Sequence, residues 1–100
     1  MAKWLQSGLR RDICILAHAL DEPTGQRLKR DLEAHYEDHV KPTQFYGALD
    51  ALVESGHLTR EADGLTDRYA LTEAGEAALR DQFAWAGERV PRRGESAERK

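Results

Sequence analysis

The chain has 100 residues, of which 40% are hydrophobic and 33% charged, and a formal net charge of −3. These values are typical of a soluble globular protein with room for one domain, and the single cysteine excludes an internal disulfide framework. No apolar run approaches the ~20 residues of a membrane span, and no signal peptide is visible at the N-terminus. We therefore expect a cytoplasmic protein without membrane contact.

Two helices separated by a proline are predicted in the first part of the chain. Apolar residues recur with a helical period between Leu9 and Leu20, which indicates one buried face. Pro23 disfavours helix in the residue before it and so ends the first helix. Thr24 is a good N-cap for the second helix. Its apolar residues repeat at four-residue spacing: Leu28, Leu32 and Tyr36.

A third helix is predicted over 42–55. Pro42 suits its first turn, and Gly56 suits the left-handed residue that follows a helix C-terminus. We expect Gly47 and Ala48 on the exposed side of this helix. Its buried stripe comprises Phe45, Leu49, Leu52 and Val53.

A hairpin and a fourth helix follow. Two short extended runs, 57–61 and 67–71, flank residues 62–64, and their Asp-Gly pair is a strong hairpin signal. Thr72 then opens a helix over about 73–89. The apolar stripe of that helix comprises Leu79, Phe83, Ala86 and Val90.

The order of these elements predicts the fold class. Two helices with a short connection form a helix-turn-helix, and a hairpin directly after them forms a wing. We expect residues 1–90 to form one domain, mostly α with a two-stranded β-hairpin, which is a winged helix-turn-helix. Residues 91–100 have almost nothing apolar to bury and are expected to be a disordered tail.

Two segments sharpen this prediction. In 42–58 the informative positions are Tyr46, Leu49, Leu52 and Gly56, and in 67–79 they are Tyr69, Leu71, Thr72 and Gly75. With the opening residues from Trp4, these segments resemble the PadR-like winged-helix transcriptional regulators, above all the small forms from halophilic archaea and their viruses. The chain departs from that pattern at Lys41, where the family often has a serine that caps the third helix.

The resemblance implies a homodimeric regulator, here expected to be a repressor, that binds double-stranded DNA at a promoter operator. Helix 42–55 would enter the major groove, and the wing, 57–71, would lie along the DNA backbone or the minor groove. The DNA-contacting residues implied in this way are Lys41, Thr43, Gln44 and Tyr46 near the third helix and Arg60 and Arg68 in the wing.

The side chains fit this role chemically. Gln44 can present a paired donor and acceptor to adenine, and Thr43 can contact a thymine methyl group. The competing interpretation is that they are solvated polar residues on an amphipathic helix. The candidates for phosphate contacts are Lys41, Arg60 and Arg68, with Arg10 and Arg11 from the first helix.

The two chain ends carry more apolar surface than a small core needs. Pairing of the fourth helix with its symmetry mate, joined by the N-terminal segment, would bury this surface in a homodimer. The alternative is that Trp85 folds back on its own domain. The predicted interface comprises Trp4, Leu5, Leu79, Phe83, Trp85 and Val90.

No motif predicts catalysis, a cofactor or a metal site. Cys14 is expected to be a buried, inert thiol, and His35 and His39 share a helix face without an evident third ligand. A second function stays open: a winged-helix protein-interaction module without DNA binding. The observations behind it are the net acidity and the acidic wing tip, with Glu61, Asp63 and Asp67.

Overall fold

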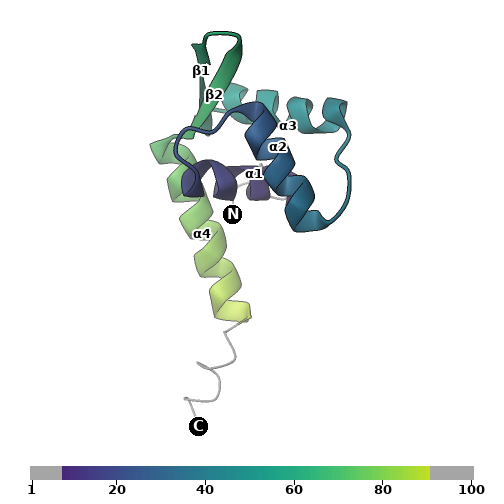
Figure 1. Ribbon diagram of the computed structural model, residues 1–100. Coiled ribbons are helices and arrows are strands. Elements are labelled where there is room, and N and C mark those ends of the chain that lie inside the picture. Colours follow the sequence, from purple (N-terminus) through teal and green to yellow (C-terminus); the bar gives the residue numbers. More distant parts are fainter. Residues whose placement is uncertain (1–7, 91–100) are drawn as a thin grey trace.

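The computed structural model describes residues 8–90, which form four helices and a two-stranded antiparallel hairpin (Figure 1). The fold class is the predicted winged helix-turn-helix. None of the helices in these residues is long and apolar enough to cross a membrane. In chain order the elements are α1 (Gly8–Ala19), α2 (Gly25–Tyr36), α3 (Pro42–Glu54), β1 (Leu58–Asp63), β2 (Thr66–Leu71) and α4 (Glu73–Arg89).

The core lies between the inner faces of α1, α2 and α3. Leu58 at the start of β1 and Leu79 in α4 extend it toward the C-terminal part of the domain. Tyr36, expected in the buried stripe of α2, is instead partly exposed, and its hydroxyl donates to the Asp12 carboxylate at 2.6 Å. The largest fully buried side chains are Ile13, Cys14, Leu28, Leu32, Phe45, Leu49, Leu52 and Leu58.

Local capping signals set the helix starts as predicted. The Thr24 hydroxyl accepts from the Arg27 amide at 3.1 Å, and the Thr72 hydroxyl accepts from the Gly75 amide at 3.0 Å. Lys41 occupies the N-cap of α3 and makes no side-chain capping bond there. Pro42 compensates in part, because it has no amide hydrogen to leave unpaired at the first helical position.

The wing, formed by β1 and β2, is longer than predicted. Asp63 pairs with Thr66, so the connecting turn consists of Gly64 and Leu65 instead of starting at Ala62. Gly64 has φ +66°, a left-handed conformation that glycine adopts without steric cost. The Asp-Gly signal located the hairpin correctly, but cross-strand pairing continues closer to the turn than residue types alone suggest.

Helix α4 begins against the wing and then leaves the domain on the side away from the hairpin tip (Figure 1). Gly75 in its first turn is buried, and a Cβ there would lie 2.3 Å from the His57 carbonyl oxygen and 2.6 Å from Leu71 Cδ1. This close approach fixes the start of α4 on the backbone before β1. Trp4, Leu5 and residues 91–100, for which the sequence made predictions, lie outside the described residues.

We predict that Gly75→Ala lowers the free energy of unfolding by about 1–3 kcal/mol, because the added methyl group overpacks the contact with His57. The matched control is Gly87→Ala, also in α4, where a Cβ meets nothing within 4 Å. That change should raise stability by about 0.5–1 kcal/mol through lower chain entropy in the unfolded state. Urea denaturation of both variants measures the difference, and equal effects would contradict the packing argument.

Candidate nucleic-acid interface

The outer face of α3 is polar and exposed over its first turns. Thr43, Gln44 and Gly47 are exposed, and a Cβ on Gly47 would meet nothing within 4 Å. Ala48 is buried, so its predicted exposure is wrong. It lies three residues after Phe45 and therefore belongs to the inward stripe of the helix. The absence of a side chain at Gly47 allows close approach of another molecule to the α3 backbone.

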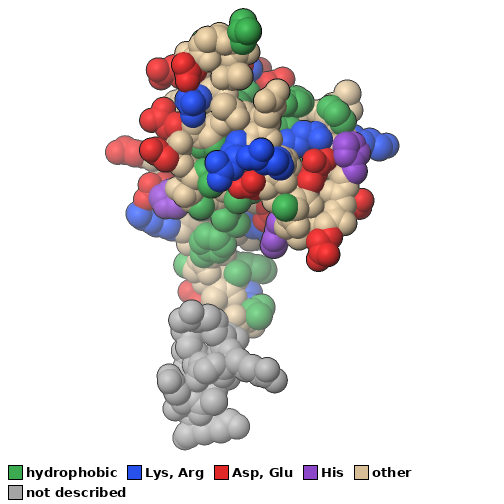
Figure 2. All heavy atoms as spheres, viewed as in Figure 1, with side chains coloured by type: hydrophobic (Ala, Val, Ile, Leu, Met, Phe, Trp, Pro, Cys, Tyr) green, Lys and Arg blue, Asp and Glu red, His purple; other side chains and the backbone are tan. Residues whose placement is uncertain are grey.

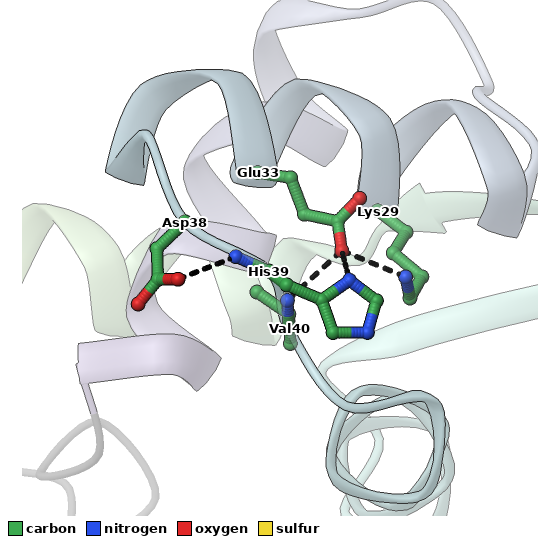
Figure 3. Close-up of polar contacts among 5 residues, drawn as sticks. All are labelled: Lys29, Glu33, Asp38, His39 and Val40. Carbon is green, nitrogen blue, oxygen red and sulfur yellow. Dashed lines mark hydrogen bonds and ion pairs between the residues drawn. The ribbon is translucent and has the colours of Figure 1, made fainter.

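The turn between α2 and α3 orients this face, and one carboxylate organises it (Figure 3). Glu33 Oε2 accepts from the Val40 amide at 2.9 Å and from Lys29 Nζ at 2.8 Å, and it lies 2.9 Å from His39 Nδ1. These bonds, led by the one from Lys29, hold the pKa of Glu33 below its ordinary value. Val40 itself is buried, so the turn is anchored on both sides. Nothing in the sequence pattern singled out Glu33 for this role.

A cleft of about 170 Å³ separates α3 from the wing, and the N-terminus of α2 forms its third wall. Gly25 packs closely at this junction, because a Cβ there would lie 3.3 Å from the Tyr46 ring and 3.5 Å from the Tyr69 ring. Tyr46, predicted to contact DNA, therefore lies where α2, α3 and the wing meet. The wall of the cleft also includes Gln26, Leu65, Thr66 and Asp67.

The wing is bonded to the start of α2. The Tyr69 amide donates to the Pro23 carbonyl at 2.9 Å, and Arg68 Nη1 donates to the Glu22 carbonyl at 2.9 Å. Thr24 adds an antiparallel bridge to Arg68. These contacts fix the wing relative to the helix-turn-helix.

The two wing arginines do not act together, because they lie on opposite faces of the hairpin. Arg60 pairs across the ladder with Tyr69, whereas Arg68 pairs with Glu61, and adjacent ladder pairs alternate faces. Arg68 Nε lies 2.6 Å from Asp63 Oδ2, and this contact raises the pKa of Arg68. Arg60 Nη2 lies 3.2 Å from Oδ1 of Asp50, a residue of α3 that the sequence analysis did not single out.

Most cations near this surface are paired with an acid. Arg11 pairs with Asp12, which also accepts from Tyr36 at the end of α2 away from the wing, so Arg11 is remote from the cleft. Acidic side chains also line the wing (Figure 2). Within residues 8–90, the cations that pair with no other described residue are Arg10, Arg30 and Lys41.

Helix α4 carries a second candidate surface. Hydrophobic side chains appear along the part of the helix that emerges from the domain (Figure 2), and Phe83, Trp85 and Val90 are 51%, 43% and 74% exposed. Leu79, predicted for the dimer interface, is only 5% exposed and packs in the core of its own chain. That part of the prediction is corrected, because the first turns of α4 lie against the domain.

The remaining chemical candidates are structural. Cys14 is fully buried, and desolvation raises the pKa of its thiol to about 12, so it stays protonated and unreactive near neutral pH. His35 and His39 are both exposed, but α2 ends at Tyr36, so His39 lies beyond the helix, where it contacts Glu33, and the expected shared helix face does not form. No group of three or more candidate metal ligands forms among residues 8–90.

Comparison with solved structures places this geometry among winged-helix regulators. The chain is similar to RosR from H. salinarum in a structure grown from NaBr. The TM-score is 0.80, the sequence identity is 29%, and the match covers 93% of this chain and 84% of that chain. It is also similar to a complex structure of RosR with S1, with a TM-score of 0.83 and 27% identity over 98% and 88% of the two chains. RosR is a winged-helix transcription regulator. No protein-family model and no curated protein matches the chain.

We predict that Glu33→Gln lowers the melting temperature at pH 7. The difference in melting temperature from the wild type should become smaller as the pH is lowered. The depressed pKa means that the Glu33 carboxylate stabilises the folded state above its ordinary pKa of 4.5 and loses this effect as the pH falls through the folded pKa. Thermal unfolding followed by circular dichroism at pH 7 and about pH 3 tests this. Glu54 is an exposed residue of α3, and Glu54→Gln is the control. Its difference in melting temperature from the wild type should not shrink between pH 7 and about pH 3. If the difference in melting temperature for Glu33→Gln is the same at both pH values, the ionised Glu33 carboxylate does not stabilise the fold in this way.

Proposed function

We propose that this protein is a sequence-specific, DNA-binding transcription regulator that acts as a homodimer and by binding alone, without catalysis. The observation that carries the proposal is the exposed polar face of α3, held beside a wing in a fold similar to RosR, a transcription regulator. The motifs around Tyr46 and Tyr69 support a closer relation to the PadR-like group of these regulators.

The α3 face is suited to base contacts in the major groove. Thr43 and Gln44 lie in the first turn of the helix, the end that approaches base edges in helix-turn-helix proteins. Gln44 offers a donor and an acceptor to adenine, and Thr43 offers a hydroxyl and a methyl group. Lys41 is exposed at the N-cap, has no ion pair among residues 8–90, and is placed for a phosphate flanking the groove.

The cleft beside α3 is suited to the DNA backbone that separates two grooves. It lies between the base-reading helix and the wing, and the Tyr46 hydroxyl and the Gln26 amide group supply hydrogen-bond donors there, whereas the Thr66 hydroxyl donates to the Asp63 carbonyl. Asp67 also lines the cleft, and its carboxylate would repel a phosphate there. We therefore propose that hydrogen bonds, more than charge, hold the backbone at this point.

The exposed part of α4 is proposed to form the dimer interface. Phe83 and Val90 lie seven residues apart and so on one face of the helix, whereas Trp85 lies on another and stacks under the Arg89 guanidinium at 4.5 Å. In an isologous dimer Phe83 and Val90 would pack against the same residues of the symmetry mate.

We predict that Gln44→Ala weakens binding to a specific duplex by about tenfold, the cost of one lost bidentate base contact. Lys41→Ala should weaken binding to all duplexes and lower the slope of log K against log salt by about one for each lysine in the complex. Fluorescence anisotropy measures both, on a duplex from the region upstream of the gene with a scrambled competitor. Arg80→Ala on α4 is the control and should leave both quantities unchanged.

Absence of binding to any duplex, at low and at high salt, would contradict the proposed function. It would favour the protein-interaction module that the acidic wing also suggests, with Glu61, Asp63 and Asp67 facing a partner.

For the dimer, we predict that Phe83→Glu halves the molar mass measured by light scattering, because it places two carboxylates in one apolar contact. Ala84→Glu adds the same charge at the next position, also exposed but about 100° around the helix, and should leave the dimer intact. Thermal unfolding checks that both variants fold. A monomeric wild-type protein at micromolar concentration would contradict the proposal.

A further inference from the structure

Arg60 is held from two sides in the space between the wing and α3. Its Nη2 lies 3.2 Å from Asp50 Oδ1, and its Cζ lies 5.8 Å from the centroid of the Tyr69 ring. Tyr69 is buried and bonded through its amide to Pro23, so it is a rigid support. The guanidinium therefore has a defined position and orientation before any ligand binds.

The partner carboxylate belongs to the proposed base-reading surface. Asp50 lies seven residues after Thr43 and three after Gly47, so the three residues share the outer stripe of α3. Asp50 is 59% exposed and Arg60 35% exposed. The ion pair with Asp50 therefore holds the Arg60 side chain of the wing at the edge of the outer face of α3, next to the open position at Gly47.

We infer that Arg60 reads a guanine base of the operator and that Asp50 is its positioning residue, an assignment that rests on the proposed DNA binding. The positive charge that draws an arginine to a phosphate is here offset by the adjacent carboxylate, which itself repels a phosphate. A base contact needs directed donors instead. The guanidinium has five of them in a fixed fork, so one edge can stay on Asp50 while another donates to guanine O6 and N7.

Arg68 provides the contrast within the same hairpin. It lies on the opposite face, where Nε contacts Asp63 within the wing and Nη1 donates to the Glu22 carbonyl, which ties the wing to the body of the domain. Arg60 has one acidic partner, in α3, and no hydrogen bond to a loop in the part of the chain that the structure describes. The two arginines therefore have different tasks, one structural and one for specificity.

The test starts with duplexes enriched from a random library by the wild-type protein. Each base pair of the enriched site is then exchanged singly, and affinities are measured at several salt concentrations. With Arg60→Ala we expect about tenfold lower discrimination at one G·C pair and an unchanged salt slope. Arg60→Lys keeps the charge but not the fork, and should show the same loss of discrimination.

The positioning role predicts a different pattern for Asp50→Asn. Removing the negative charge should raise the affinity for all duplexes, steepen the salt slope by about one for each replaced residue, and reduce discrimination at the same G·C pair. Arg80→Ala and Glu76→Gln remove the members of an arginine–acid pair on α4 and serve as matched controls. They should leave both the preference and the slope unchanged.

Two results would overturn the inference. A shallower salt slope for Arg60→Ala, restored by Arg60→Lys, would make Arg60 a phosphate contact. An unchanged preference at every G·C pair in Arg60→Ala would remove its role in specificity. Both results require that the wild-type protein binds the enriched duplex, whereas failure of the library to enrich any sequence would count against the proposed function itself.

Discussion

The bonds between the second wing strand and the start of α2 are the constraint on which the candidate site depends. A two-stranded hairpin alone is marginally stable and would move freely relative to the helices. Here the Tyr69 amide on the Pro23 carbonyl and Arg68 on the Glu22 carbonyl hold it in one place. Tyr46 and Tyr69 both pack against Gly25 at the N-terminus of α2. The cleft, the α3 face and the Arg60 side chain owe their relative positions to this junction.

Charge in this protein is arranged in local pairs, and this limits how it can bind a polyanion. The wing arginines and most helix arginines have acidic partners, which leaves Arg10, Arg30 and Lys41 without an ion pair among residues 8–90. Since counterion release scales with the number of phosphates neutralised, few unpaired cations imply a modest salt dependence. Specific hydrogen bonds from α3 then carry a larger share of the affinity than in a basic domain. The net charge of −3 is consistent with that balance.

The sequence predicted the elements because their signals are local. Thr24 and Thr72 cap helices through bonds to residues three positions away, and Pro42 and Gly64 act at single backbone positions. The spacing from Phe45 in α3 also indicates that Ala48 is buried. Because alanine is small, its residue type alone does not distinguish a buried position from an exposed one. These features need no knowledge of the rest of the chain.

The parts of the site that sequence analysis missed depend on contacts between distant residues. Which face of the wing Arg60 and Arg68 occupy follows from the strand register, and a one-residue change of register would place both on the same face. The role of Asp50 depends on its contact with Arg60 of the wing, which lies beside α3. The role of Glu33 depends on the Val40 amide, which the turn after α2 directs back toward that helix. Residue types therefore identified the candidates, while the fold assigned their tasks.

The two proposed surfaces lie at opposite ends of the domain, and this separation has a mechanical consequence. Helix α4 is fixed at Gly75 and Leu79 and then extends away from the wing tip (Figure 1). A dimer contact through Phe83 and Val90 would therefore leave both α3 faces uncovered. The distance between the two α3 helices would be set by the rigid first turns of α4, because no flexible linker intervenes between the wing and that helix. Half-site spacing on DNA would then be a property of the packing around Gly75 as much as of the interface itself.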